Sequence, residues 1–101
     1  MKIMKTKKQK IMEECWNLNY ELIKWLNEHL KVYLEDADKN VDLEFHKYKY
    51  KRKTYTQKEL IERLITITDT LISGFVWTFE NVKLVNEMYD ILKLIHFSLW
   101  W

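Results

Sequence analysis

Apolar residues recur along the first third of the chain at alternating spacings of four and three. One series steps through Ile11, Cys15, Leu18, Leu22, Trp25, His29 and Val32, and a second lies one residue further on, from Met12 to Tyr33. This heptad pattern predicts one long amphipathic helix over residues 8–35. Two adjacent series make a wide face, so we expect more than one neighbour. Glutamates recur every seven residues beside the first series, where we expect a solvated flank: Glu14, Glu21, Glu28 and Glu35.

The period changes after a polar, turn-like stretch at 36–40. Val41, Leu43 and Phe45 alternate with polar residues, which favours a short strand or an extended arm. A helical stripe through Val41, Phe45 and Tyr48 is the competing interpretation. We expect an extended arm over 41–55. Because a lone strand needs a partner, this arm either pairs across a symmetric dimer or remains a loop.

The start of the next helix carries a clear signal. Thr56-Gln57-Lys58-Glu59 has the form of a capping box, and apolar residues follow it at helical spacing. This predicts a helix over 57–73 that ends at the Ser73-Gly74 pair. Thr78 is a second candidate cap, and we predict a third helix over 78–99. The alternative is one kinked helix from 57 to about 98.

Composition supports a helical protein. The chain has 101 residues, no proline and a single glycine, Gly74, while 48% of its residues are hydrophobic. All-β folds draw on glycine and proline for their turns, and helices need neither. We therefore predict one all-α domain over residues 1–101. Its architecture would be a small antiparallel three-helix bundle with a flexible basic tail at 1–7 and a short extended basic arm between the first and second helices.

Charge is segregated along the chain. Residues 1–10 carry five lysines, and residues 47–58 carry six cations with no acid, whereas acids outnumber cations in 11–46 and in 59–101. The segment 47–55 interleaves lysines with tyrosines, which suits phosphate contacts and base stacking. It also runs into a helix N-terminus, which favours an anion. The candidate ligand or nucleic-acid contacts are Lys47, Tyr48, Lys49, Tyr50, Lys51, Arg52, Lys53, Tyr55 and Thr56. The alternative is a solvated basic loop, or an arm lying against the glutamate row.

Catalytic and metal-binding patterns are absent from the sequence. No histidine pair has zinc spacing, no Glu-x-x-His is present, and one glycine cannot make a phosphate loop. Cys15 is alone on an apolar series, where we expect a small buried side chain. Fifteen lysines against two arginines argue against sequence-specific base reading. We therefore expect no enzyme activity, no metal and no cofactor.

These observations favour a regulatory or inhibitory protein that binds stoichiometrically. We expect a protein or nucleotide partner, contacted through 47–55, and an origin in a bacterium, phage or plasmid. A nucleic-acid-binding module that also uses the N-terminal lysines is the alternative. Neither a signal peptide nor a transmembrane segment is expected, which fits a cytoplasmic protein. The surplus of apolar surface predicts a homo-oligomer whose interface includes Trp16, Trp25, Trp100 and Trp101.

Overall fold

The computed structural model describes residues 4–100, so Trp101 and the first three residues of the predicted tail lie outside the described part of the chain. The elements follow one another in the order α1 (Lys7–Cys15), α2 (Leu18–Ala37), β1 (Lys47–Tyr50), β2 (Lys53–Thr56), α3 (Gln57–Ser73), α4 (Phe79–Ile95) and a final 3₁₀ turn, η1 (His96–Ser98).

The predicted all-α three-helix bundle is wrong. Over residues 4–100 the structure has four α-helices and a two-stranded antiparallel sheet, with 68% of these residues helical and 8% in strands. The sheet is a hairpin inside the predicted arm, with Tyr48 opposite Tyr55 and Tyr50 opposite Lys53. The alternating segment 41–46 forms turns instead of a strand. A strand needs a partner, and β1 finds its own in the residues immediately after the turn.

The long first helix is interrupted at Trp16 and Asn17, which separate α1 from α2. Asn17 lies outside the helical region, with φ −130° and ψ 55°. Asparagine and tryptophan are weaker helix formers than alanine or leucine, and an asparagine side chain competes for backbone hydrogen bonds. A continuous helix would need packing to hold it straight here, but none of the residues in α1 is buried.

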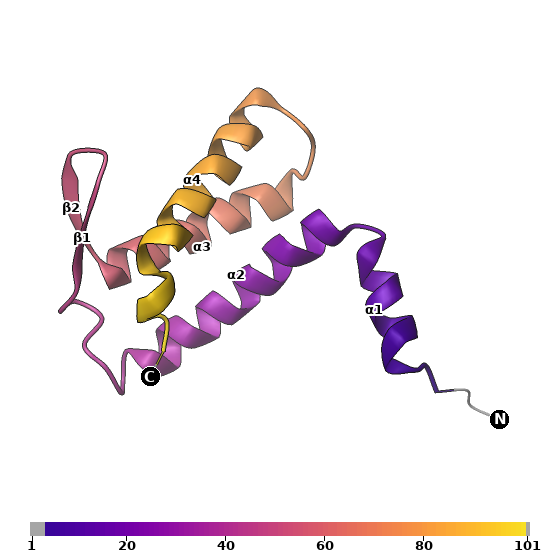
Figure 1. Cartoon of the computed structure of the whole chain (residues 1–101). Helices are drawn as coiled ribbons and strands as arrows, with labels where there is room; N and C mark the ends of the chain where they lie inside the picture. Colours follow the sequence, from indigo (N-terminus) through magenta and orange to yellow (C-terminus); the bar gives the residue numbers. More distant parts are fainter. Residues whose placement is uncertain (1–3, 101) are drawn as a thin grey trace.

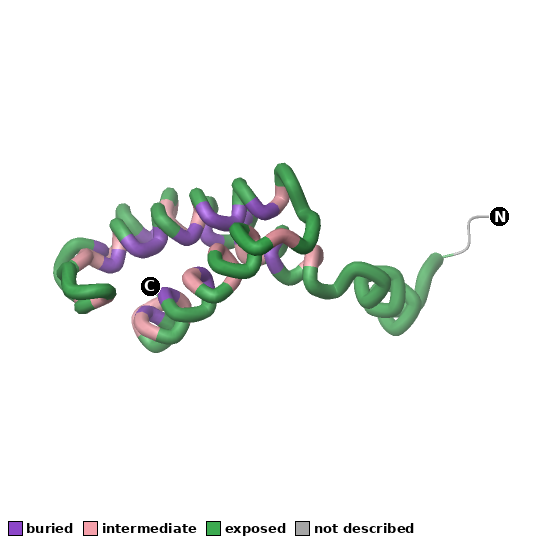
Figure 2. Tube along the Cα trace, turned by 90° about the horizontal axis from the view of Figure 1, so that it is seen from above, coloured by how far each residue is buried: buried purple, intermediate pink, exposed green. Residues whose placement is uncertain are grey.

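The core forms around α3, which packs against α2 on one side and α4 on the other. Five aliphatic residues of α3 are almost fully buried: Leu60, Ile61, Leu64, Ile67 and Leu71. Figure 2 shows buried positions on the inner faces of the helices and none along α1. Burial of each such side chain contributes roughly 1.5–3 kcal/mol, so this helix supplies much of the stability. Both hydrogen bonds of the predicted capping box are present at Thr56 and Glu59.

Helices α2 and α4 meet at one end and diverge at the other (Figure 1). They are joined at the closed end by Tyr33, whose hydroxyl donates to the carbonyls of Ser98 at 3.4 Å and Trp100 at 2.8 Å. Burial raises the pKa of Tyr33. Figure 1 also shows α1 projecting away from the open end. The C-terminal tail therefore connects α4 to α2 at the closed end, while α1 lies outside the three packed helices.

Candidate functional site

The basic hairpin (residues 47–56) sorts its side chains by face. Opposed residues in an antiparallel pair share a face, and so do alternate residues along each strand. Tyr48, Tyr50 and Tyr55 therefore lie on one face, where they are partly buried against the core. The charged side chains are all exposed: Lys47 and Lys49 on the opposite face, Lys51 and Arg52 at the tip, and Lys53, which lies opposite Tyr50, at the end of the tyrosine face next to the tip. The structure thus brings together the predicted cations but turns the predicted aromatic partners away from solvent.

The hairpin tip consists of Lys51 and Arg52, whose φ angles are 49° and 68°. A two-residue connection with positive φ at both positions is the type I′ turn, which strongly prefers Asn-Gly or Gly-Gly. Lysine and arginine in this left-handed region cost roughly 1–2 kcal/mol per residue. Strain of this kind persists where the surrounding structure enforces it, and it is found preferentially at functional sites. The tip places two cations at the most distant point of the hairpin.

The tyrosines hold the hairpin on the body of the protein. The hydroxyl of Tyr48 shares a hydrogen bond with the hydroxyl of Ser98 in the C-terminal tail. Gln57, which is buried at the end of the hairpin, donates through its side-chain amide to the Ser98 carbonyl at 2.9 Å. Stacking of Tyr48 on a nucleic-acid base would require breaking its bond to Ser98 and removing its ring from the core. The hairpin therefore offers charge without the stacking platform that the sequence predicts.

The N-terminus of α3 has already used its hydrogen-bond donors. The backbone N–H groups of Thr56 and Glu59 bond to the capping-box side chains at 2.9 and 3.1 Å. Those of Gln57 and Lys58 donate to the carbonyls of His46 at 3.2 Å and Leu43 at 3.0 Å. A phosphate at this helix end would have to displace one of these bonds. The predicted nucleotide contact at Thr56 therefore lacks free backbone donors.

A cavity of about 400 Å³ that is lined by both charged and apolar side chains lies beneath the hairpin, between β1, β2, α3 and α4. Across it Arg63 makes a bidentate ion pair with Glu87, at 2.6 and 2.9 Å. The hydrogen bond from Arg63 lowers the pKa of Glu87, and the charge of Lys51 at the hairpin tip adds to the effect. The Tyr50 hydroxyl is buried here without a hydrogen-bond partner among the described residues. The ion pair fixes the orientation of the surface on which the hairpin rests.

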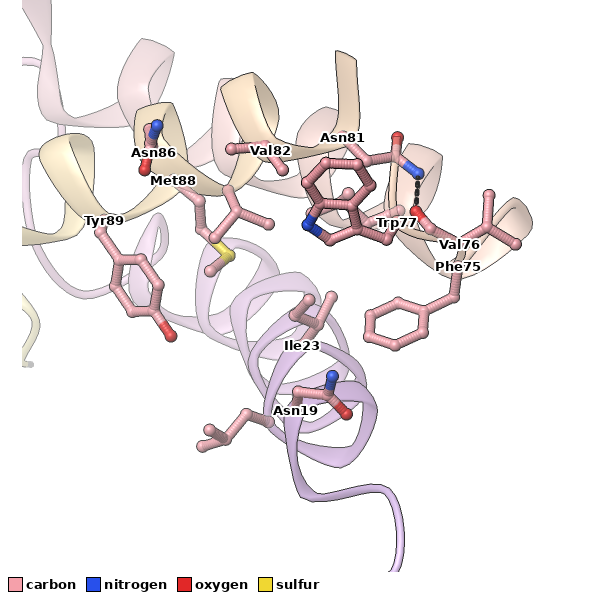
Figure 3. A pocket seen from close by; sticks show the side chains of 13 residues that line it. Asn19, Ile23, Phe75, Val76, Trp77, Asn81, Val82, Asn86, Met88 and Tyr89 are labelled. Carbon is pink, nitrogen blue, oxygen red and sulfur yellow. Dashed lines mark hydrogen bonds between the residues drawn. The ribbon is translucent and has the colours of Figure 1, made fainter. Parts of the chain in front are cut away.

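A second feature, which the sequence did not indicate, is an apolar groove between the diverging helices. The α2–α4 groove has a volume of about 330 Å³. Figure 3 shows Ile23 and Asn19 of α2 on one side and Val82, Met88 and Tyr89 of α4 on the other. The connection between α3 and α4 closes one end with Phe75, Val76 and Trp77. The side chain of Asn81 holds that connection by donating to the carbonyls of Gly74 and Val76 at 2.8 Å.

Several tryptophans remain exposed on the protein surface. Trp16 is 88% exposed, Trp25 58% and Trp100 64%, so all three predicted interface residues that the structure describes are accessible. The fourth, Trp101, lies outside the described residues. Trp77, which precedes the Thr78 cap, is also highly exposed and was not among the predicted interface residues. Cys15 is exposed as well, contrary to the expected burial, because α1 leaves the body of the protein.

The buried polar residue of the helix interface is Asn27. Its side-chain amide donates to the Thr68 hydroxyl at 2.9 Å and to the Asp69 carboxylate at 3.0 Å. Lys31 binds the same carboxylate at 2.9 Å, and that bond is the main cause of the lowered pKa of Asp69. A partnered polar group of this kind fixes the register of two packed helices. It belongs to the architecture of the α2–α3 pair, away from the basic hairpin.

Within residues 4–100 no cluster of three or more histidine, cysteine or acidic side chains is arranged to hold a metal ion. Over the same residues, no helix has the length and apolar character needed to cross a bilayer. No protein-family model, curated protein or solved structure matches the chain. Any function must therefore be inferred from the geometry of the hairpin and of the groove.

Proposed function

We propose that this chain is a non-enzymatic binding protein that acts stoichiometrically, as a regulator or inhibitor of another protein. The basic hairpin is the contact, and it meets an acidic surface of the partner. The observation that carries the proposal is the hairpin tip, where Lys51 and Arg52 are held in an unfavourable backbone conformation at the end of an anchored, cation-bearing element. A solvated loop with no partner has no need of such a rigid support.

An acidic protein surface suits this hairpin better than a nucleic acid. The tyrosines face the core, so base stacking is lost. Glu59 and Glu62 line the cavity beneath the hairpin, so a phosphate backbone that ran from the tip toward the base of the hairpin would meet acidic side chains. A compact group of cations fits a short acidic loop or helix. Rim charges of this kind mainly accelerate association and select the partner.

Binding to a nucleic-acid backbone is the second candidate, favoured by the exposure of every cation in the hairpin. It requires affinity that falls steeply with salt. We also propose that the protein works as a homo-oligomer. Support for this comes from the exposed Trp16 and Trp25 and from the apolar α2–α4 groove, because exposed apolar patches on soluble proteins commonly mark interaction sites.

The test is fluorescence anisotropy with two labelled probes, an oligoglutamate peptide and a single-stranded DNA with the same number of charges, at low and physiological salt. One variant replaces Lys49, Lys51, Arg52 and Lys53 by alanine. The matched control removes the same charge elsewhere, through alanine at Lys24, Lys39, Lys83 and Lys93. Four exposed ion pairs contribute roughly 0.2–1 kcal/mol each, so we expect the hairpin variant to lose about tenfold or more in peptide affinity.

The control variant should retain most of its affinity for the peptide. Equal losses in both variants would mean that net charge alone attracts the probes, and would refute the hairpin as the contact. Tighter, more salt-sensitive binding of the DNA than of the peptide would overturn the protein-partner proposal in favour of the second candidate. Failure of the unmodified protein to bind either probe at low salt would refute both.

A further inference from the structure

Helix α1 is specified by its sequence but has no packing partner within its own chain. Thr6 and Gln9 form a reciprocal capping box, with bonds of 2.8 and 3.1 Å. Yet Ile11 and Met12 are 49% and 56% exposed, and no residue of the helix is buried. An isolated helix of nine residues is unstable in water, because nucleation outweighs so few hydrogen bonds. Stable formation of α1 therefore requires a surface to pack against.

The shape of the molecule also indicates that α1 lacks a packing partner within its own chain. The radius of gyration is 16.1 Å, whereas a compact domain of about 100 residues has roughly 13 Å. The difference reflects α1, which extends away from the packed helices in Figures 1 and 2. Its apolar side chains therefore lie in solvent beyond the open end of the α2–α4 groove.

The groove provides a surface of the required kind. Its walls are mainly aliphatic and aromatic, with Ile23 on α2 across from Val82 and Tyr89 on α4 (Figure 3). Leu22 and Val85 also line it. An apolar groove between two helices is a common receptor for the apolar face of a third helix. The volume of about 330 Å³ suits a few side chains of the size of isoleucine and methionine.

The charges of the two surfaces are complementary. Lys7, Lys8 and Lys10 surround the first turn of α1 and make no ion pair among the described residues, whereas Lys5 pairs with Glu13. The lining of the groove carries no charged side chain, but Glu21 precedes Leu22 on α2 and has no ion-pair partner in the described part of the chain. A lysine of a docked α1 at the border of the groove would therefore be attracted by this carboxylate.

We propose that α1 of one copy docks into the α2–α4 groove of a second copy, and that the exchange is reciprocal. The short connection at Trp16 and Asn17 directs α1 outward, away from the groove of its own chain (Figure 1). A short connection that directs an element outward favours exchange between identical chains. The product is a closed two-fold dimer in which each copy completes the core of the other.

This inference deepens the proposed self-association and rests on it, but it is independent of the partner of the hairpin. Cys15 at the end of α1 provides the test, because it is the only cysteine and is exposed. Val82→Cys places a second thiol in the groove. The control, Glu80→Cys, lies two residues earlier on the same helix, on a different face that does not line the groove. Both variants are oxidised at micromolar concentration and analysed on non-reducing gels.

We expect a disulfide-linked dimer with Val82→Cys and only background linkage with Glu80→Cys, since a disulfide requires Cα atoms within about 7 Å. Equal linkage of the two variants would reflect random collision and would overturn the exchange. In the Val82→Cys variant, an intrachain disulfide between Cys15 and the introduced thiol of a monomer would also overturn it. That result would show that α1 folds back onto its own groove.

Sedimentation of the unmodified chain distinguishes the exchange of α1 between two copies from self-association through any other surface. A monomer would refute both. A dimer in which the Val82→Cys variant links no better than the Glu80→Cys variant would refute the exchange alone and place the interface elsewhere. Ile11→Gln with Met12→Gln should convert the dimer to a monomer, whereas Glu13→Gln with Glu14→Gln, which leaves the capping box and the lysines of α1 in place, should not. The first pair removes no buried contact within the chain, so persistence of the dimer in that variant would count against the exchange.

Discussion

Replacing Lys51 and Arg52 by Asn and Gly should stabilise the protein, because it relieves the backbone of the hairpin tip. The φ angles of 49° and 68° cost roughly 1–2 kcal/mol per residue for ordinary side chains. Glycine adopts this region freely, although its greater loss of chain entropy on folding returns about 0.5–1 kcal/mol, and asparagine tolerates it better than lysine. The expected net gain in the free energy of unfolding is about 1–2 kcal/mol, since the two effects partly cancel.

Two assays measure this gain. Urea unfolding reports the global value, provided that the hairpin unfolds together with the core on which its tyrosines pack. Amide hydrogen exchange in β1 and β2 reports the local value, and roughly tenfold slower exchange corresponds to about 1.4 kcal/mol. The double variant should at the same time bind the oligoglutamate probe more weakly, because two of the five exposed hairpin cations are gone.

Lys51→Ala with Arg52→Ala is the matched control. It removes the same charge but leaves an ordinary side chain at both positive-φ positions, so binding should weaken while stability stays nearly unchanged. If the Asn-Gly variant is no more stable than the alanine variant, and exchange in the strands is no slower, then the tip is not strained. A functional reason for its conformation would then be lacking.

Two further predictions follow from the surroundings of the hairpin. Tyr50→Phe removes a buried hydroxyl that has no partner among the described residues, so this variant should raise the free energy of unfolding in urea by about 1 kcal/mol. Tyr48→Phe removes the hydrogen bond to Ser98, so that variant should lower the free energy of unfolding by about 0.5–1.5 kcal/mol. A loss of stability in Tyr50→Phe would indicate a partner for that hydroxyl. The pKa values of Asp69 and Glu87 are lowered in the folded protein. Their ion pairs therefore stabilise the protein at pH values above the ordinary carboxyl pKa of about 4. This stabilisation is lost as the pH falls through the lowered pKa values. Acid titration of unfolding should therefore show a decline that Asp69→Asn with Glu87→Gln makes shallower, and an unchanged slope in that variant would contradict the assignment.

Local sequence signals predicted the elements whose hydrogen bonds are local. The helix α3 covers the predicted range 57–73, because its capping box and its apolar period act within a few residues of one another. The Thr78 cap of α4 is likewise present and accepts from the Asn81 N–H at 3.1 Å. The cationic residues of the candidate site could also be read from the sequence, since charge on an exposed loop depends little on packing.

The hairpin and the break in the first helix could not be predicted in this way. A turn made by Lys51 and Arg52 carries none of the glycine or asparagine that marks a hairpin, and only the packing of its tyrosines on the core holds it in place. The heptad series continues unbroken through Trp16 and Asn17, so periodicity alone implies one helix. The chain separates there because one half finds a partner in α3 and the other finds none.

The same distinction separates what the sequence determines from what the tertiary structure decides. The sequence determines the helical character, the starts of α3 and α4, and the position of the basic segment, because each depends on residues that are close along the chain. Tertiary packing decides which face each side chain occupies. It turns the tyrosines inward, buries the side-chain amide of Asn27 between α2 and α3, and opens the α2–α4 groove. These outcomes depend on contacts between residues far apart in sequence. The free energies of these contacts exceed the local conformational preferences that a sequence pattern can reveal.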